Sequence, residues 1–301
     1  MAKRVFVVLI GDAGGKAVDL YQQLQERDAL AQGRAAGYEV EVVWATSFEQ
    51  YGAVRKRLAA SAVDAIVAEP ASVATAGLIL KSLQGTSGLV LLNVWDPTFE
   101  PHLASWGGGF PAGTISQPQQ GIGKIQGQQL SAVVPQGANV LVVAGPPRSS
   151  AARERLEGLR STIRPDVTLH TTEAGQWSET DGILAFNSWY GVFRSRREEI
   201  HAIAGQTDDL AVGASKAGTA VANPEHARMF GRASLFGVGG CPGYGKDKVD
   251  AGTLKASVTV RPNAGMAVAL LRRFWTSGEP IPPRTTSEAA PYPAGSADRP
   301  A

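Results

Sequence analysis

The stretch that decides the fold runs from Val140 to Gly158 and has the sequence VLVVAGPPRSSAARERLEG. Its five apolar residues predict a buried strand, the Gly and Pro residues predict a turn, and Ser149 or Ser150 predicts the N-cap of a helix. In open α/β folds such a turn places backbone N–H groups and helix side chains at the carboxyl end of the sheet, where ligands bind. Arg153 and Arg155 are two residues apart and leave the helix in nearly opposite directions, so only one of them can face a ligand.

The alternation of strand and helix patterns continues on both sides of this stretch. We expect strands at 5–10, 38–44, 63–68, 89–93, 139–144, 167–171, 201–205, 233–238 and 254–260, and helices at 18–35, 48–60, 73–83, 119–133, 151–162, 179–190, 210–221 and 264–274. This order predicts an α/β fold in which helices cover both faces of mostly parallel sheets. The Pro- and Gly-rich segment 94–117 is expected to be irregular and to separate two α/β units, and the tail from Gly278 to be poorly ordered at its end.

Composition excludes several classes of protein. The chain has 301 residues, enough for two domains, and its 29 basic and 27 acidic residues give a net charge of +2 without a basic block, so nothing favours nucleic-acid binding. Cys241 is the single cysteine, which rules out an internal disulfide. No apolar run approaches the roughly 20 residues that a membrane-spanning helix needs.

The N-terminal residues resemble the start of a signal peptide, because Lys3 and Arg4 precede the apolar run Val5–Ile10. Asp12 ends that run and no small-residue cleavage site follows, so we interpret the run as the first strand. Two alternatives stay open: the protein is cytoplasmic, or a signal peptide was removed before this sequence begins.

No motif of catalysis or cofactor binding is complete. The loop Gly240–Lys246 has the spacing of a phosphate-binding loop, but Asp247 stands where Ser or Thr should bind Mg²⁺, and Gly11–Lys16 is one residue short of the same pattern. The four histidines lack metal-ligand spacing, and no Gly-x-Ser-x-Gly motif occurs. The sequence therefore predicts no enzyme, no cofactor and no metal site, with a nucleotide-dependent enzyme as an alternative that rests on these loops alone.

Polar and aromatic residues at strand ends are better candidates for a binding site. Gln206 to Asp209 follow a strand, where they form either a ligand contact or a helix N-cap with an acidic first turn. Trp177 follows another strand, and an aromatic face there can stack on a sugar ring, whereas Trp189 lies within a helix and is expected in the core. Tyr21 lies early in the first long helix.

Five segments carry a resemblance to the type I periplasmic binding proteins, the sugar-binding family that includes the ribose-binding proteins: 63–70, 149–158, 206–214, 236–240 and 254–262. The resemblance covers nearly the whole chain. It implies two Rossmann-like lobes with parallel sheets that close on a ligand and are joined by a three-segment hinge, with crossovers near 103–106, 260–263 and 280–283. The implied N-terminal lobe is 1–103 plus 262–282, and the implied C-terminal lobe is 104–261 plus 283–301.

The resemblance also implies which residues contact the ligand. Arg155 matches the arginine that bonds sugar oxygens, Trp177 matches the aromatic residue that stacks on the ring, and Tyr21 matches an aromatic residue opposite it. The remaining implied contacts are Asp19 near the first polar position, Asn93 where an Asp or Asn bonds the sugar, and Thr207 and Asp208 of the acidic motif beside the hinge. We expect Arg155→Ala to weaken binding more than about tenfold, or ~1.4 kcal/mol, with little change in thermal stability.

Four positions depart from the family pattern. Val94, Thr207, Gly239 and Val260 stand where the family often has Arg, Asn, Asp and Gln. The site then offers fewer groups to a polyhydroxylated ring, and each unpaired hydroxyl in a closed site costs roughly 1–3 kcal/mol. A smaller polyol, a modified sugar or a less polar ligand is therefore favoured over a standard ribose or pyranose.

The resemblance implies a monomeric, periplasmic solute-binding protein whose partners are an ABC-transporter permease and its ATPase. A second hypothesis is a ligand-sensing module that signals to a kinase or regulator. Repressors of the lactose-repressor type share the fold, but they begin with a helix-turn-helix and this chain begins with a strand, so DNA binding is not expected.

Overall fold

A computed structural model describes residues 2–12, 14–17, 19–46, 49–60, 63–195 and 198–298. The chain forms two compact units: unit 1 contains residues 1–117 and 262–287, and unit 2 contains residues 118–261 and 288–301. The predicted helix starts at Val18 and Phe48 lie outside the described residues. Within those residues, no helix is both long and apolar enough to cross a membrane.

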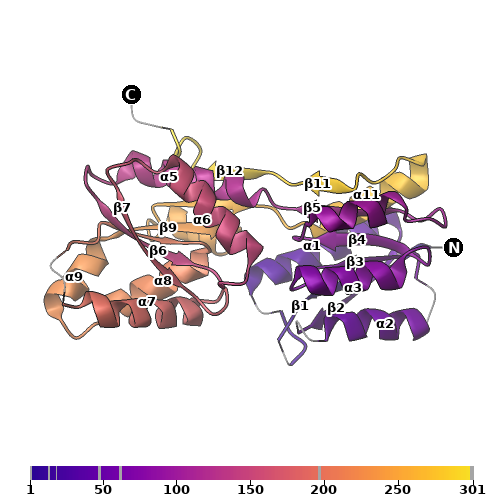
Figure 1. Ribbon diagram of the computed structural model, residues 1–301, viewed down its shortest axis with the longest axis horizontal. Coiled ribbons are helices and arrows are strands. Elements are labelled where there is room, and N and C mark those ends of the chain that lie inside the picture. Colours follow the sequence, from indigo (N-terminus) through magenta and orange to yellow (C-terminus); the bar gives the residue numbers. More distant parts are fainter. Residues whose placement is uncertain are drawn as a thin grey trace. The chain divides into compact units, whose positions relative to one another are not determined.

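Unit 1 is built on a six-stranded sheet in the order β11-β5-β4-β3-β1-β2, in which every neighbouring pair is parallel (Figure 1). Its strands are β1 (Arg4–Ile10), β2 (Glu39–Ala45), β3 (Ala65–Ala68), β4 (Gly88–Leu92), β5 (Ala112–Ser116) and β11 (Arg284–Thr286). Its helices are α1 (Leu20–Ala36), α2 (Gln50–Ala60), α3 (Val73–Leu83), α4 (Glu100–Ala104) and α11 (Ala264–Ser277), with a short 3₁₀ turn, η1 (Pro97–Phe99).

The alternation of side chains along β1 gives unit 1 a core on each face of its sheet. Phe6 and Val8 pack with buried residues of α2 and α3, whereas Val5, Val7 and Leu9 pack with buried residues of α1 and α11. Successive side chains of a strand point to opposite faces, so a continuous apolar run is what a strand covered on both faces requires.

Unit 2 repeats this plan with a six-stranded sheet in the order β12-β10-β9-β8-β6-β7, parallel except for β12 against β10. Its strands are β6 (Asn139–Ala144), β7 (Thr168–Glu173), β8 (Ala202–Gly205), β9 (Ser234–Gly239), β10 (Ala256–Val260) and β12 (Ala289–Tyr292). Its helices are α5 (Gln119–Val133), α6 (Ser150–Thr162), α7 (Glu179–Phe193), α8 (Asp208–Thr219), α9 (Pro224–Arg232) and α10 (Gly245–Asp250). Helices α5 and α6 cover one face, and α7 and α8 cover the other (Figure 1).

The stretch from Val140 to Gly158 forms the predicted strand, turn and helix, as β6 and α6. Ser149 is the N-cap of α6, because its side chain accepts a hydrogen bond from the Ala152 N–H at 3.3 Å. Val140 and Val142 face α5 and α6, and Leu141 and Val143 face α7 and α8. The predicted α/β fold with two lobes and parallel sheets is confirmed.

Six α-helices and strands were not expected from the sequence. Segment 94–117 is not irregular throughout, since it contains α4 and β5, and β5 pairs with β4 and β11. Helix α9 was not predicted, although Asn223 caps it and Pro224 is its first residue. Helix α10, which follows the predicted Gly-rich turn, and strands β11 and β12 of the tail were not predicted either. The expected poor order at the end of the tail stays a prediction.

The unit boundaries differ from the predicted ones at two of three crossovers. The chain passes between units after residues 117, 261 and 287, whereas the sequence placed the first and third passages after 103 and 282. The reason is strand pairing: β5 and β11 are hydrogen-bonded members of the unit 1 sheet, so the chain leaves unit 1 only after each of them.

Candidate functional site

Asn93 lies directly after β4, at the carboxyl end of the unit 1 sheet. It is the one non-glycine residue among those described with a positive φ, 57°, a conformation that asparagine tolerates better than most residues. Its side-chain Nδ2 donates to the Glu69 carboxyl at 2.7 Å and to the Tyr21 hydroxyl at 3.3 Å. Its Oδ1 accepts from Asn263 Nδ2 at 2.7 Å. The predicted contacts Asn93 and Tyr21 are therefore brought together.

Glu69 follows β3 and is the centre of this cluster. Its side chain is 6% exposed and accepts hydrogen bonds from Asn93 Nδ2, from Gln25 Nε2 at 3.4 Å and from the side chain of Gln22. Burial raises the pKa of Glu69 to about 7. In the sequence analysis Glu69 marked only the end of a strand. Its position as an acidic residue directly after an apolar strand could have indicated a site residue.

Two further residues of the cluster come from the first turn of α1. Asp19 is the N-cap of this helix, and its carboxylate accepts from the Gln22 N–H at 2.8 Å. Its negative charge also raises the pKa of Glu69. Tyr21 accepts a second hydrogen bond on its hydroxyl oxygen, from Gln117 Nε2 at 2.7 Å. Gln117 follows β5 and Asn263 is the N-cap of α11, so the cluster draws on the carboxyl ends of three strands and on two helix starts.

Arg155 is the centre of a second cluster, in unit 2. Its side chain lies on α6 and is 8% exposed. Its Nε donates to Gln119 Oε1 at 2.7 Å, and its Nη1 donates to the Gln206 carbonyl oxygen at 2.6 Å. A Cβ on Gly123 of α5 would lie 1.9 Å from the Arg155 carbonyl oxygen, so α5 and α6 approach closely only because this residue is glycine.

Arg153 differs from Arg155 as the two-residue spacing predicted. Its side chain is 66% exposed and pairs with Glu157 at 4.0 Å on the same helix.

The hydrogen bonds of Arg155 affect the stability expected of a variant, because removing a buried donor leaves its acceptors unsatisfied. The expectation that Arg155→Ala leaves thermal stability unchanged therefore does not fit this geometry.

Trp177 lies beside Arg155 in the loop after β7. The Arg155 guanidinium carbon is 5.4 Å from the centre of the Trp177 ring, within the range of a cation–π interaction. The ring also covers Gly145, where a Cβ would lie 2.2 Å from it. The Gly145 N–H donates to Gln206 Oε1 at 2.9 Å, and Gln206 Nε2 donates to the Ala152 carbonyl at 2.8 Å. Gln206 thus ties the turn after β6 to the start of α6, a role that the sequence did not reveal.

Thr207 and Asp208 begin α8 beside this cluster. Thr207 is the N-cap: its side chain accepts from the Leu210 N–H at 3.1 Å and donates to the Trp177 carbonyl at 3.3 Å. Asp208 is 4% exposed, and its two carboxylate oxygens accept from Ser257 Oγ at 2.6 Å and the Gly240 N–H at 2.8 Å. Burial raises the pKa of Asp208 to about 6. Both residues therefore brace unit 2, and a ligand contact by either stays a prediction.

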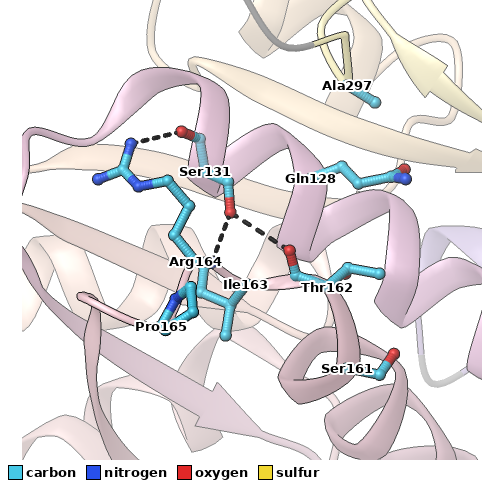
Figure 2. Close-up of a pocket in the computed structure, with 8 residues that line it drawn as sticks. All are labelled: Gln128, Ser131, Ser161, Thr162, Ile163, Arg164, Pro165 and Ala297. Carbon is cyan, nitrogen blue, oxygen red and sulfur yellow. Dashed lines mark hydrogen bonds between the residues drawn. The ribbon is translucent and has the colours of Figure 1, made fainter.

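A separate pocket of about 390 Å³ in unit 2 contains none of the predicted site residues. Figure 2 shows Arg164 at one side of it, with its guanidinium next to Ser131. Arg164 donates to the carbonyl oxygens of Ser131, Val134 and Pro135 and pairs with Asp166, so its charge is used to close the end of α5. No group of three or more potential metal ligands occurs within the described part of the chain.

Comparison with known proteins finds a family whose model matches most of the chain. The model of the periplasmic binding protein domain family matches residues 19–274. No curated protein sequence matches the chain.

Solved structures share the fold at low identity. One is a periplasmic solute-binding protein of an ABC transporter from Actinobacillus succinogenes with bound D-allose, at 16% identity and a TM-score of 0.78 over 97% of each chain. Another is the fructose-binding periplasmic domain of a hybrid two-component system, at 19% identity and 0.77 over 96% of this chain and 90% of that one. A third is the Caulobacter myo-inositol-binding protein, at 15% identity and 0.76 over 98% and 94%.

Proposed function

Because the chain belongs to the family of periplasmic binding protein domains, a family of binding proteins rather than enzymes, we propose that it captures a small sugar or polyol for ABC-type uptake. Ligand binding would shift an equilibrium between open and closed forms of the protein. Its partners would be an ABC-transporter permease and ATPase, and its location the periplasm.

The observation that carries this proposal is the composition of the two clusters. Each lies at the carboxyl ends of parallel strands, where open α/β sheets bind ligands. Unit 1 supplies amide and hydroxyl groups through Asn93 and Tyr21, and unit 2 supplies a guanidinium and an indole through Arg155 and Trp177. Polar groups of this kind bond hydroxyls, and an aromatic face stacks on the apolar face of a ring. The sugars and the polyol named in the three similar structures have this chemistry.

A second candidate function is ligand sensing. One structure of the same fold is the fructose-binding periplasmic domain of a hybrid two-component system, so the fold also serves proteins that pass the binding event to a signalling partner. Both candidates require the same ligand site. They differ in the partner, which is a permease in one case and a histidine kinase in the other, and a pull-down with each of these purified partners in the presence of ligand distinguishes them.

The test of the binding function is a thermal-shift and calorimetry series with D-allose, D-fructose, myo-inositol and a wider panel of sugars and polyols. A ligand that binds only the folded protein raises its melting temperature. We expect Arg155→Lys to weaken the tightest member of the panel more than about tenfold, since a lysine keeps the charge but loses the planar fork of donors.

Arg153→Lys is the matched control, because Arg153 lies on the same helix and its side chain is 66% exposed. Its affinity should equal that of the wild type. If the Arg155→Lys variant binds the ligand as tightly as the wild type, Arg155 does not contact the ligand. If no compound of the panel raises the melting temperature, the assignment of a sugar or polyol ligand is wrong.

A further inference from the structure

The direction of the Asn93 side-chain amide decides what unit 1 offers to a ligand. An amide presents an oxygen acceptor on one side and an NH₂ donor on the other, and the two ends are nearly equal in shape. In the structure Nδ2 lies against Glu69 and Oδ1 lies against Asn263. Each amide oxygen has two lone pairs, so Oδ1 can accept a second hydrogen bond from a ligand hydroxyl.

Most partners of Asn93 do not fix this direction. Asn263 is itself an amide, and its own Oδ1 has no hydrogen-bond partner, so a rotated Asn263 could accept from a rotated Asn93. The Tyr21 hydroxyl can donate or accept. A joint rotation of Asn93 and Asn263 would therefore leave these contacts satisfied.

Glu69 is the partner that does fix the direction. When ionised, its carboxylate only accepts hydrogen bonds, so every amide around it must present an NH₂ group. Gln25 cannot rotate away, because its Oε1 accepts from the Ala264 backbone N–H at 2.8 Å, and a backbone N–H only donates. As oriented, the amides around Glu69 present donors, which match a charged carboxylate; Gln22, whose Oε1 has no hydrogen-bond partner, is not fixed in the way that Gln25 is.

We propose that Glu69 is a positioning residue that fixes the Asn93 amide with its oxygen away from the carboxylate, so that unit 1 accepts a hydrogen bond from a ligand hydroxyl. This rests on the proposed sugar or polyol binding and specifies which group of the ligand meets unit 1. It also disfavours a ligand that brings a carboxylate to this side, because the acceptor and the buried acid would both repel it.

The positioning should depend on pH. Glu69 faces Asn93 after β4, Gln22 and Gln25 on α1, and the Asp19 carboxylate at the start of α1, while α11 contributes the uncharged Asn263 through Asn93. Protonated Glu69 has an O–H to donate, which a rotated Asn93 or a rotated Gln22 can accept, so the carboxyl no longer requires the Asn93 NH₂ group. The amide is therefore held in one direction above the pKa of Glu69, about 7, and samples both directions below it.

The first test needs no ligand. The Asn93 side-chain amide signals in ¹⁵N–¹H NMR spectra, assigned by their loss in Asn93→Asp, should shift with a midpoint near pH 7 in the wild type and should not titrate in Glu69→Gln. Asp28→Asn is the matched control, since it removes another partly buried carboxyl of unit 1, whose pKa is raised by burial and which bonds Gly265 instead. Its Asn93 signals should titrate as in the wild type. Asn93 signals that do not shift with pH in the wild type, or that shift in Glu69→Gln as they do in the wild type, would overturn the inference.

The second test measures affinity by calorimetry for whichever of D-allose, D-fructose and myo-inositol binds most tightly. At pH 8 we expect Glu69→Gln to weaken binding by roughly three- to tenfold, because affinity falls with the fraction of molecules in the competent orientation. At pH 5.5 the two proteins should converge. A constant ratio across this pH range would contradict the inference, and failure of all three compounds to bind would count against the proposed function while the NMR result still decides the role of Glu69.

Discussion

Unit 1 gathers its polar side chains around the carboxyl of Glu69, whereas unit 2 gathers them around the guanidinium of Arg155. Both centres lie near the carboxyl ends of parallel strands, and both are less than one-tenth exposed. The carboxyl can lose its charge near neutral pH, since its pKa is about 7, whereas an arginine stays charged throughout. The two units of a repeated fold thus differ, because one carries a pH-dependent centre and the other a permanent cation.

The largest effect expected from this comparison is on stability as a function of pH. Each unit has a buried acid with a raised pKa: Glu69 moves from 4.5 to about 7 and Asp208 from 3.8 to about 6. The unfolded chain loses these protons at lower pH than the folded one, so stability falls as pH rises between the two values and is level above the folded pKa. At about 1.4 kcal/mol per pKa unit, each acid costs about 3 kcal/mol once both states are ionised.

Urea unfolding between pH 4 and 8 checks this prediction. Asp208→Asn should remove the part of the decline that ends near pH 6, and Glu69→Gln the part that ends near pH 7. If either variant keeps the wild-type profile, the acid it replaces does not titrate with a raised pKa. Because the two declines in stability end at different pH values, the pH dependence of unit 1 can be distinguished from that of unit 2.

The next effect concerns packing in unit 2, where the Trp177 ring covers Gly145. Gly145→Ala places a methyl group 2.2 Å from the Trp177 ring, so the indole must move away from Arg155. We expect a loss of about 2 kcal/mol in unfolding free energy, typical of overpacking, together with a changed tryptophan fluorescence spectrum.

The control is Gly191→Ala on α7 of the same unit, where nothing lies within 4 Å of the new Cβ. This substitution should be neutral or stabilising by up to ~1 kcal/mol, because alanine is the better helix former. Equal stability of Gly145→Ala and the wild type would show that Trp177 does not need its place over Gly145.

The smallest effect tests whether Thr207 acts only as a helix cap. Thr207→Ala should lower the unfolding free energy by about 1 kcal/mol, since the Leu210 N–H loses its acceptor. Thr207→Ser keeps the hydroxyl and should restore most of the stability. If Thr207→Ser also recovers ligand affinity, the hydroxyl rather than the methyl group is what unit 2 needs there; a ligand affinity unchanged in both variants would exclude Thr207 from the site.

The fold followed from local patterns where elements are long and continuous. Helices α3 and α5 and strand β6 have the predicted bounds, because apolar spacing and flanking Gly, Pro or Ser residues mark them. Strand β5 was missed because Pro111 precedes it and its short sequence, AGTIS, gains its place only by pairing with β4 and β11. Helix α9 was missed although Asn223 and Pro224 are ordinary helix-start residues.

The site was less accessible to sequence reasoning than the fold. Trp177, Tyr21 and the pair Arg153 and Arg155 were singled out by their positions, and a family resemblance gave them their roles and added Asn93. The structure places Arg155, Trp177, Tyr21 and Asn93 in two clusters, and their ligand contacts stay predictions. Glu69 and Gln206 were overlooked as central residues because their partners are distant in sequence. Glu69 bonds residues of α1 and the residue after β4, and no local pattern connects these.

The pairing of β11 with β5 has a consequence for synthesis of the chain. Residues 284–286 hydrogen-bond to residues 114–116, and α11 supplies part of the core under β1. Unit 1 therefore lacks an edge strand and a helix until residue 286 has left the ribosome, whereas residues 118–261 of unit 2 are available earlier. Since domains fold as units when their segments are present, most of unit 2 should fold during translation before unit 1 can complete its sheet, and β12 completes the sheet of unit 2 afterwards.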